Sequence, residues 1–237
     1  MASRLQALHS EIVECRACPR LVAWREEAAR IKVKRYRDWD YWARPIVGFG
    51  DPRARVLLMG LAPAAHGGNR TGRMFTGDRS GDFLFAALFR AGFANQPTSV
   101  RRGDGLKLSG AFITAPCRCA PPANKPLQSE LQRCSVWLDK EVALLAQVRL
   151  IIALGGIAWA ATLDHFRRRG IALPRPLPKF GHGAEARIAG APILLGSYHV
   201  SQQNTNTGKL TPEMLDRVLA RARVLSQQSA QQEIVTP

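Results

Sequence analysis

Four short and almost continuously apolar runs constrain the fold of this chain more than any other feature. They occupy residues 55–60, 110–114, 149–154 and 192–196. Runs of this kind are typical of parallel strands that are buried on both faces. Segments with helical spacing follow them, at residues 83–93, 127–147, 156–169 and 211–225. The alternation predicts an α/β fold, a three-layer αβα arrangement with a central, mostly parallel four-stranded sheet, whose ligands bind at the carboxyl ends of the strands.

The remaining segments complete one domain. A length of 237 residues with 46% hydrophobic content suits a single core spanning residues 1–237. Residues 2–14 show helical spacing, whereas residues 30–44 are basic and aromatic without a period and are expected to run over the surface. Residues 226–237 are polar and are expected to form a frayed tail.

The charge balance points to a polyanionic partner. The chain has 34 Lys and Arg against 18 Asp and Glu, a formal net charge of +16 at pH 7. Nucleic acid is the expected partner. No apolar run approaches the roughly 20 residues that span a bilayer, and residues 1–14 lack the layout of a signal peptide. We therefore expect a cytoplasmic protein without a membrane partner, and a monomer.

Four of the five cysteines form a pattern that is typical of a metal centre. Cys15 and Cys18 make a CxxC pair, and Cys119 and Cys134 make a second, wider pair. In a reducing compartment such a set indicates a structural zinc ion or an iron–sulfur cluster, because both take soft thiolate ligands, and the spacing does not separate the two. Unconnected buried cysteines are the alternative. Cys117 is expected to be a packed thiol and not a ligand.

Two polar, glycine-containing loops follow predicted strands and are expected to meet at one edge of the sheet. The first covers residues 60–78 and the second covers residues 197–208. Loops of this kind expose backbone amides and allow a ligand to approach closely. The alternative for the first is an ordinary long surface loop. Together the loops predict a cleft.

These segments carry a resemblance to a known family. GLAPAAHGGNRTGRMFTGD at 60–78, RCAPPANKP at 118–126, SYHVSQQNTNTGKLT at 197–211 and the four-cysteine spacing resemble family 5 (type-b) uracil-DNA glycosylases. The resemblance implies a DNA-repair enzyme that hydrolyses the N-glycosidic bond of uracil and other deaminated bases, such as hypoxanthine, in DNA. It also implies a structural [4Fe–4S] cluster on Cys15, Cys18, Cys119 and Cys134.

The chemistry needs one carboxylate near the sugar. Breaking the bond develops positive charge on the deoxyribose and negative charge on the departing base, so the site must stabilise both and hold a water molecule. Family 4 enzymes place an acidic residue after the first glycine of the first motif, where this chain has Leu61. Asp78 matches the family's proposed water-orienting aspartate. A helix N-cap is the alternative role for Asp78.

Other positions are expected to hold the extruded base, which proteins grip by stacking and by hydrogen bonds. Phe75 is placed to stack, and the backbone at Gly60, Leu61 and Ala62 is placed to meet the base carbonyl. By resemblance, His199 donates to the anion developing on uracil, and Asn124 matches a further position near the site. The alternatives are a packed histidine and a turn residue after the prolines. Family 4 enzymes have an asparagine where this chain has Ala115, which implies a broader substrate range.

The remaining site expectations concern DNA itself. Residues of the second loop are expected to enter the duplex where the base departed, and two residues of the first loop are expected to contact phosphates. The first group is Ser201, Gln202, Gln203, Asn204 and Thr205, and the second group is Asn69 and Arg70. A non-catalytic, zinc-stapled nucleic-acid-binding module is the alternative class; it explains the charge and the cysteines but not two polar loops at one sheet edge.

Overall fold

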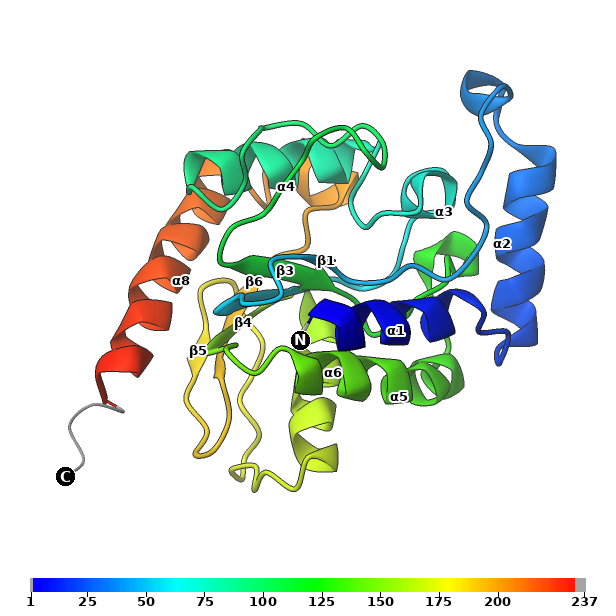
Figure 1. Ribbon diagram of the computed structural model, residues 1–237. Coiled ribbons are helices and arrows are strands. Elements are labelled where there is room, and N and C mark those ends of the chain that lie inside the picture. The colour runs from blue at the N-terminus through cyan, green and yellow to red at the C-terminus, as the bar shows by residue number, and fades with distance from the viewer. Residues whose placement is uncertain (1, 233–237) are drawn as a thin grey trace.

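A sheet of six strands lies between two layers of helices in this computed structural model, which describes residues 2–232 (Figure 1). The strands are β1 (Phe49–Gly50), β2 (Val56–Met59), β3 (Ala111–Thr114), β4 (Leu150–Leu154), β5 (Glu185–Ala186) and β6 (Ile193–Ser197), in the order β1-β3-β2-β4-β6-β5. The four central strands are parallel and the two edge strands are antiparallel. The three-layer, mostly parallel architecture is confirmed, but the sheet has six strands and not four, because each edge carries a strand of two residues.

Every residue of the four central strands is buried, and successive side chains serve different layers. Val56 and Leu58 pack on one side of the sheet, and Leu57 and Met59 pack on the other. This alternation is the period of two that a strand imposes. The continuous apolar runs of the sequence therefore reflect two cores, one on each face.

The helices divide between the two faces. Figure 1 shows α4 (Arg79–Arg90) and α8 (Pro212–Gln232) on one side of the sheet. On the other side it shows α1 (Ala2–Val13), α5 (Gln128–Leu144) and α6 (Gly156–Arg168). The chain after β2 thus leaves toward one face, and the chain after β4 leaves toward the other. In open α/β sheets such a divergence opens a crevice at the carboxyl ends of the strands.

Helix α2 (Pro19–Ile31) stands apart from these layers and was not expected from the sequence. It begins directly after Cys18, with Pro19 in its first turn, where the missing N–H costs nothing. The short helix η1 (Lys34–Tyr36) follows, so only the later part of the 30–44 segment is irregular.

The C-terminal segment also differs from expectation. Helix α8 continues to Gln232, so residues 226–232 are helical and not frayed, while residues 233–237 lie outside the described part of the chain. Leu219 and Leu225 of this helix are fully buried against the sheet, which explains its persistence. None of the helices within residues 2–232 is long and apolar enough to cross a lipid bilayer.

Candidate active site

The two polar loops both start at carboxyl ends of central strands. The loop at residues 60–78 follows β2 and contains the short helix α3 (Gly68–Thr71). The second loop follows β6 and contains α7 (Gln202–Asn206). The rings of Phe75 and His199 are in contact, so the two loops meet at this edge of the sheet as expected.

Asp78 is the N-cap of α4. Its Oδ1 accepts a 2.9 Å hydrogen bond from the amide of Gly81. The carboxylate is largely buried, and burial raises its pKa above the ordinary aspartate value, although the Gly81 amide acts in the opposite direction. The residue also lines an open cavity, so water has access to it. Asp78 therefore combines the capping role with the properties of a reactive carboxylate.

A guanidinium held between two aromatic rings forms one wall of the same cavity. The Cζ atom of Arg70 lies 3.7 Å from the ring centroid of Tyr36 and 4.1 Å from that of Trp39. Its Nε and Nη2 donate to the carbonyl oxygens of His66 and Gly77, at 2.7 and 2.8 Å. Its positive charge lowers the pKa of Asp78, after the larger effects of burial and the amides. No local motif indicates this contact, because Arg70 lies more than thirty residues from Tyr36 and Trp39 in the sequence.

Phe75 and His199 bring the two loops together. Their ring centroids are 6.3 Å apart with the planes tilted by 42°. The phenylalanine is only 7% exposed and has a left-handed backbone, with φ of 49°, a conformation that is costly for a bulky residue and often marks a functional site. Burial lowers the pKa of His199, and its imidazole has no hydrogen-bond partner within residues 2–232. A neutral imidazole is thus free to bind a ligand beside an aromatic ring.

Two glycines are required by the position of Phe75. A Cβ atom on Gly60 would lie 3.0 Å from Cζ of Phe75, and a Cβ atom on Gly81 would lie 2.0 Å from the Phe75 carbonyl oxygen. Next to Gly60, the amides of Leu61 and Ala62 donate to no acceptor in the described structure, whereas the Leu61 carbonyl accepts from Cys117. Two unpaired amides therefore follow the end of β2, as expected for a site that binds a carbonyl.

Asn124 does not join this group in the structure. It is exposed, ends the short helix η2 (Pro122–Asn124), and has a left-handed φ of 56°. Its side chain makes no hydrogen bond within the described residues. The arrangement matches the turn role that prolines favour, and the expected position of Asn124 beside the base stays a prediction.

The residues of α7 divide into internal and exposed members. Asn204 donates from Nδ2 to the His199 carbonyl at 2.8 Å, and Thr205 donates to the carbonyl of Ser201, the N-cap. These bonds fix the loop that carries His199. Gln202 and Gln203 are exposed and free to meet a partner.

Asn69 and Arg70 are buried, at 0% and 2% exposure, which contradicts the expected phosphate contacts of their side chains. The fold uses them internally, because α3 packs beside α2 and under the segment of Tyr36 and Trp39 (Figure 1). Polar residues in a loop are usually exposed, but here the residues that cover Asn69 and Arg70 are distant in the sequence.

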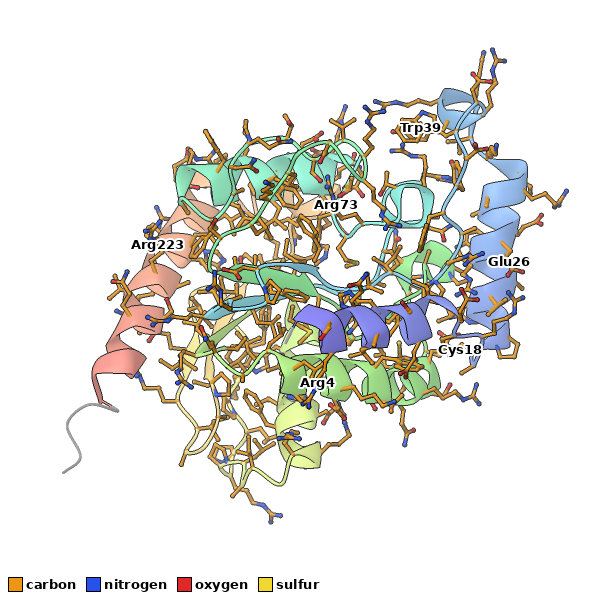
Figure 2. The ribbon with its side chains drawn as sticks, viewed as in Figure 1. Arg4, Cys18, Glu26, Trp39, Arg73 and Arg223 are labelled. Atoms are coloured by element: carbon orange, nitrogen blue, oxygen red, sulfur yellow. The ribbon has the colours of Figure 1, made fainter. Side chains whose placement is uncertain are left out.

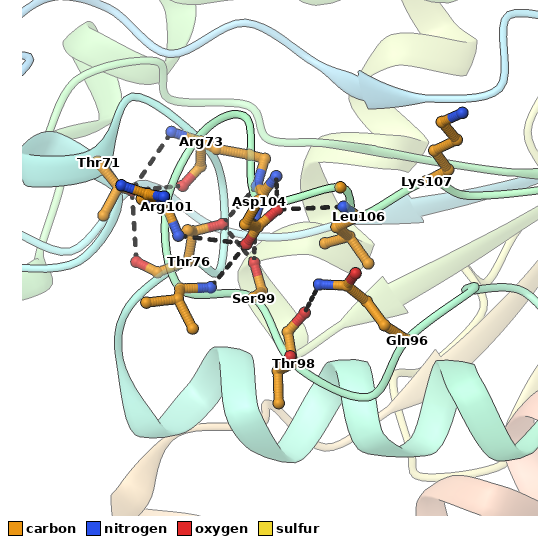
Figure 3. A network of polar contacts seen from close by, with 12 residues as sticks. Thr71, Arg73, Thr76, Gln96, Thr98, Ser99, Arg101, Asp104, Leu106 and Lys107 are labelled. Atoms are coloured by element: carbon orange, nitrogen blue, oxygen red, sulfur yellow. Dashed lines mark hydrogen bonds and ion pairs between the residues drawn. The ribbon is translucent and has the colours of Figure 1, made fainter.

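A buried ion pair supports the middle of the first loop (Figure 3). The two terminal nitrogens of Arg73 donate to both oxygens of Asp104 at 2.9 and 2.7 Å, and its Nε donates to Thr76 at 2.9 Å. Ser99 accepts a further bond from the guanidinium. Burial alone would raise the pKa of Asp104, but Arg73 and three backbone amides outweigh it and hold this pKa far below its ordinary value. This support of the Phe75–Asp78 segment was not expected from the sequence.

The four predicted metal ligands line one small cavity. Its lining comprises Cys15, Ala17, Cys18, Leu21, Val22, Pro45, Arg118, Cys119, Arg133, Cys134 and Trp137. Three N–H groups point at the sulfurs: from Trp137 to Cys15 and from the amide of Arg118 to Cys134, both at 3.3 Å, and from the guanidinium of Arg25 to Cys119 at 3.0 Å. Cys117 lies apart, fully buried, with its thiol donating to the Cys119 carbonyl.

The four cysteines line this cavity as free thiols. Among the residues described, no three His, Cys, Asp or Glu side chains lie close enough to hold one metal ion.

Comparisons with known proteins identify the family of this chain. The family model of the Uracil DNA glycosylase superfamily matches residues 47–223. The chain is 52% identical over 226 residues to the Type-5 uracil-DNA glycosylase of Mycobacterium tuberculosis, covering 95% of this chain and 83% of that protein. It is 52% identical to the one of Thermus thermophilus, with 93% and 98% coverage, and 46% identical to the one of Pyrobaculum aerophilum, with 90% and 89% coverage. The chain therefore belongs to the uracil DNA glycosylase superfamily and, within it, to the type-5 family.

Proposed function

We propose that the protein is a DNA-repair glycosylase that hydrolyses the N-glycosidic bond between uracil and deoxyribose and leaves an abasic site. The observation that carries the proposal is the contact of an aromatic ring with a neutral imidazole, Phe75 with His199, between two loops at one sheet edge. The loop that carries Phe75 ends at the partly buried carboxylate of Asp78. The type-5 relatives support the same reaction. A binding module without catalysis would not need these groups together.

In this mechanism, Asp78 orients the attacking water and faces the positive charge that grows on the sugar. The amide of Gly81 occupies Oδ1 and fixes the orientation of the carboxylate. The cavity beside Asp78 admits water, and the nearby Arg70 favours the ionised form. An ionised Asp78 then stabilises the transition state more than the ground state, which is the condition for catalysis.

Other residues hold the departing base, on the side of the glycosidic bond away from the sugar. Phe75 stacks on the extruded ring, and the unpaired amides of Leu61 and Ala62 meet a base carbonyl. A neutral His199 donates one N–H to the base as it becomes an anion. Because uracil leaves as a stabilised anion, no second carboxylate is needed to protonate it.

The proposed substrate range extends to hypoxanthine and other deaminated bases. Ala115 is 1% exposed at the end of β3, and its methyl group offers no hydrogen bond to read a base edge. A pocket that recognises the base mainly by stacking and by backbone amides discriminates weakly between rings. Asn124 is proposed to approach the base only when DNA is bound.

DNA contacts are proposed for the α7 segment. Gln202 and Gln203 are exposed at its start, and Ser201, Asn204 and Thr205 keep the segment folded, so that it enters the space left by the base. The net charge of +16 supplies attraction to phosphates without reading sequence. We also propose that the protein acts as a monomer, in the cytoplasm, on nucleoid DNA.

The four cysteines are proposed to hold a [4Fe–4S] cluster. They fit the group because they line one cavity and because backbone and indole N–H groups point at their sulfurs. In a cluster each thiolate binds a different iron, so the sulfurs stand farther apart than around zinc. The cluster would serve as a cross-link between the segment before α2, the segment joining β3 to α5, and α5 itself.

An excision assay tests the function. Oligonucleotides that carry uracil, hypoxanthine or xanthine are incubated with the protein, and the abasic product is cleaved by alkali and measured. We expect excision of uracil and of hypoxanthine by the parent and loss of both in Asp78→Asn. Strand cleavage that needs no alkali, or no product from uracil, would contradict the proposal.

A further inference from the structure

Arg25 is a buried arginine without an ion pair. It is 1% exposed and lies on α2, seven residues after Cys18, a spacing that puts both on one face of the helix. The glutamates next along the helix pair elsewhere: Glu26 with Arg16, and Glu27 with Arg30. No carboxylate in residues 2–232 pairs with Arg25. A buried positive charge without an ionic partner is strongly unfavourable unless another negative group compensates it.

The groups that Arg25 contacts belong to the cysteine cavity. Its Nη1 donates to Sγ of Cys119 at 3.0 Å, and both terminal nitrogens reach the Cys15 carbonyl at 3.4 Å. Neutral thiols would leave the guanidinium uncompensated. Metal-bound cysteines are thiolates, so an occupied centre supplies the missing negative charge.

The backbone of Arg25 contacts the active-site loop. Its carbonyl accepts a 3.0 Å hydrogen bond from Nδ2 of Asn69, which is fully buried in α3. The next residue, Arg70, donates to the Gly77 carbonyl, one residue before Asp78. Figure 2 shows Cys18 and Glu26 along α2, with Trp39 near the far end of the helix from Cys18. A continuous set of contacts thus runs from the cysteines to the loop.

We propose that Arg25 is a positioning residue that joins the four-cysteine centre to the loop carrying Asp78. Its guanidinium balances the charge of the thiolates, and its carbonyl anchors Asn69. The inference rests on the metal centre proposed above. If Arg25 has this role, loss of the four-cysteine metal centre loosens residues 67–78 before the rest of the fold.

The test compares three variants with a matched control. Arg25→Gln removes the charge, Arg25→Lys retains it, and Asn69→Ala breaks only the link to the loop. Arg30→Gln makes the same change on the exposed face of the same helix, where the side chain is 73% exposed. The measurements are iron per chain, the rate of iron loss to a ferrous chelator, the reduction potential of the centre, and hydrogen exchange of residues 67–78.

The inference predicts a distinct pattern. Arg25→Gln should lose iron about tenfold faster or more, as expected for a residue that supports metal ligands. Its centre should also have a lower reduction potential, because a neighbouring positive charge favours the added electron, and Arg25→Lys should restore this potential. Asn69→Ala should exchange hydrogen faster at 67–78 with iron loss unchanged. Arg30→Gln should match the parent throughout.

Several results would overturn the inference. One is that Arg25→Gln loses iron at the rate of the parent and has the reduction potential of the parent. Another is that hydrogen exchange at residues 67–78 does not change when the parent is stripped of iron. If Arg25→Gln does not fold, a potential in Arg25→Lys far from that of the parent, or parent-like exchange in Asn69→Ala, would overturn it. A parent without bound metal would reject the proposed centre as well, whereas iron in the parent with an inert Arg25 would reject this inference alone.

Discussion

Asp78 accepts a 2.9 Å hydrogen bond at Oδ1 from the amide of Gly81, so the residue that we assign to catalysis also caps α4. The two roles do not compete, because the cap uses one oxygen. The other oxygen, Oδ2, lies against Gly67, where any side chain would collide with it, since a Cβ atom there would be only 2.0 Å away. Capping therefore orients the carboxylate for its chemistry.

Asp78→Asn should separate the two roles. Asparagine caps helices as well as aspartate does, so the fold should survive. Loss of the charge should lower the single-turnover rate of uracil excision by about a hundredfold or more. Thermal stability and affinity for DNA are measured beside the rate. Excision within a fewfold of the parent would show that the carboxylate does not orient the water.

The pH dependence of the same residue should follow from its raised pKa. If the ionised form is required, excision should increase with pH, with a midpoint above the ordinary aspartate value of 3.8. Because the folded pKa exceeds the unfolded one, this group favours folding at low pH, and the contribution is lost as pH rises through the folded pKa. At neutral pH, Asp78→Asn should therefore be as stable as the parent or more stable by calorimetry. A clear loss of stability would show that the capping charge dominates.

His199→Ala should slow excision about tenfold to a thousandfold, because it removes a donor to the base anion. His199→Gln keeps a neutral donor and should retain more activity. Burial lowers the pKa of His199, so the imidazole is neutral at pH 7 and the wild-type contribution should not require protonation. Rates of the parent that rise as pH falls from 7 toward 6 would contradict a neutral donor.

Asp104→Asn should destabilise the protein by about 3–5 kcal/mol at neutral pH, because Arg73 would stay buried without its partner. The pKa of Asp104 is depressed in the folded state, so its contribution is present above the unfolded pKa and is lost as pH falls through the folded one. The difference from the parent should therefore shrink in acid. Asp216→Asn is the control, since its pair with Arg90 is exposed and should contribute less than about 1 kcal/mol. Equal effects of the two variants in urea denaturation would contradict this account.

Affinity for undamaged duplex should fall steeply with salt. If contacts to phosphates dominate, the logarithm of the affinity decreases linearly with the logarithm of salt concentration. Fluorescence anisotropy over a salt series measures the slope, and a nearly flat line would point to contacts other than phosphate. Arg167→Gln should leave the slope unchanged, because this residue pairs with Asp164 on the surface.

The central fold was predictable because burial on both faces leaves a strong signal. β4, for example, is apolar at every position from Leu150 to Leu154. The edge strands are only two residues long and therefore leave no such signal in the sequence. Helix α2 was missed because Arg25, a charged residue, occupies its buried face and interrupts the apolar spacing. Pro19, in its first turn, was the available clue.

The meeting of the two loops was predictable because local motifs define them, whereas the roles of their residues stay predictions. Asp78, Phe75 and His199 stand beside glycines or at a strand end, and the structure brings their loops together. Asn69 and Arg70 were misjudged because their burial depends on Arg25, Tyr36 and Trp39, which approach only in three dimensions. Similarly, no residue near Arg73 in the sequence indicates that Asp104 is its ion-pair partner.

The two-residue strands at the edges of the sheet also affect how readily neighbouring copies of this protein aggregate at high local concentration. β1 and β5 run antiparallel to their neighbours and are too short to offer an extended row of unpaired backbone groups. Long, flat margins invite another chain to add a strand, which is a common route to aggregation. Copies of the protein that electrostatic attraction concentrates on one DNA molecule would therefore lack a long exposed strand edge through which their sheets could pair.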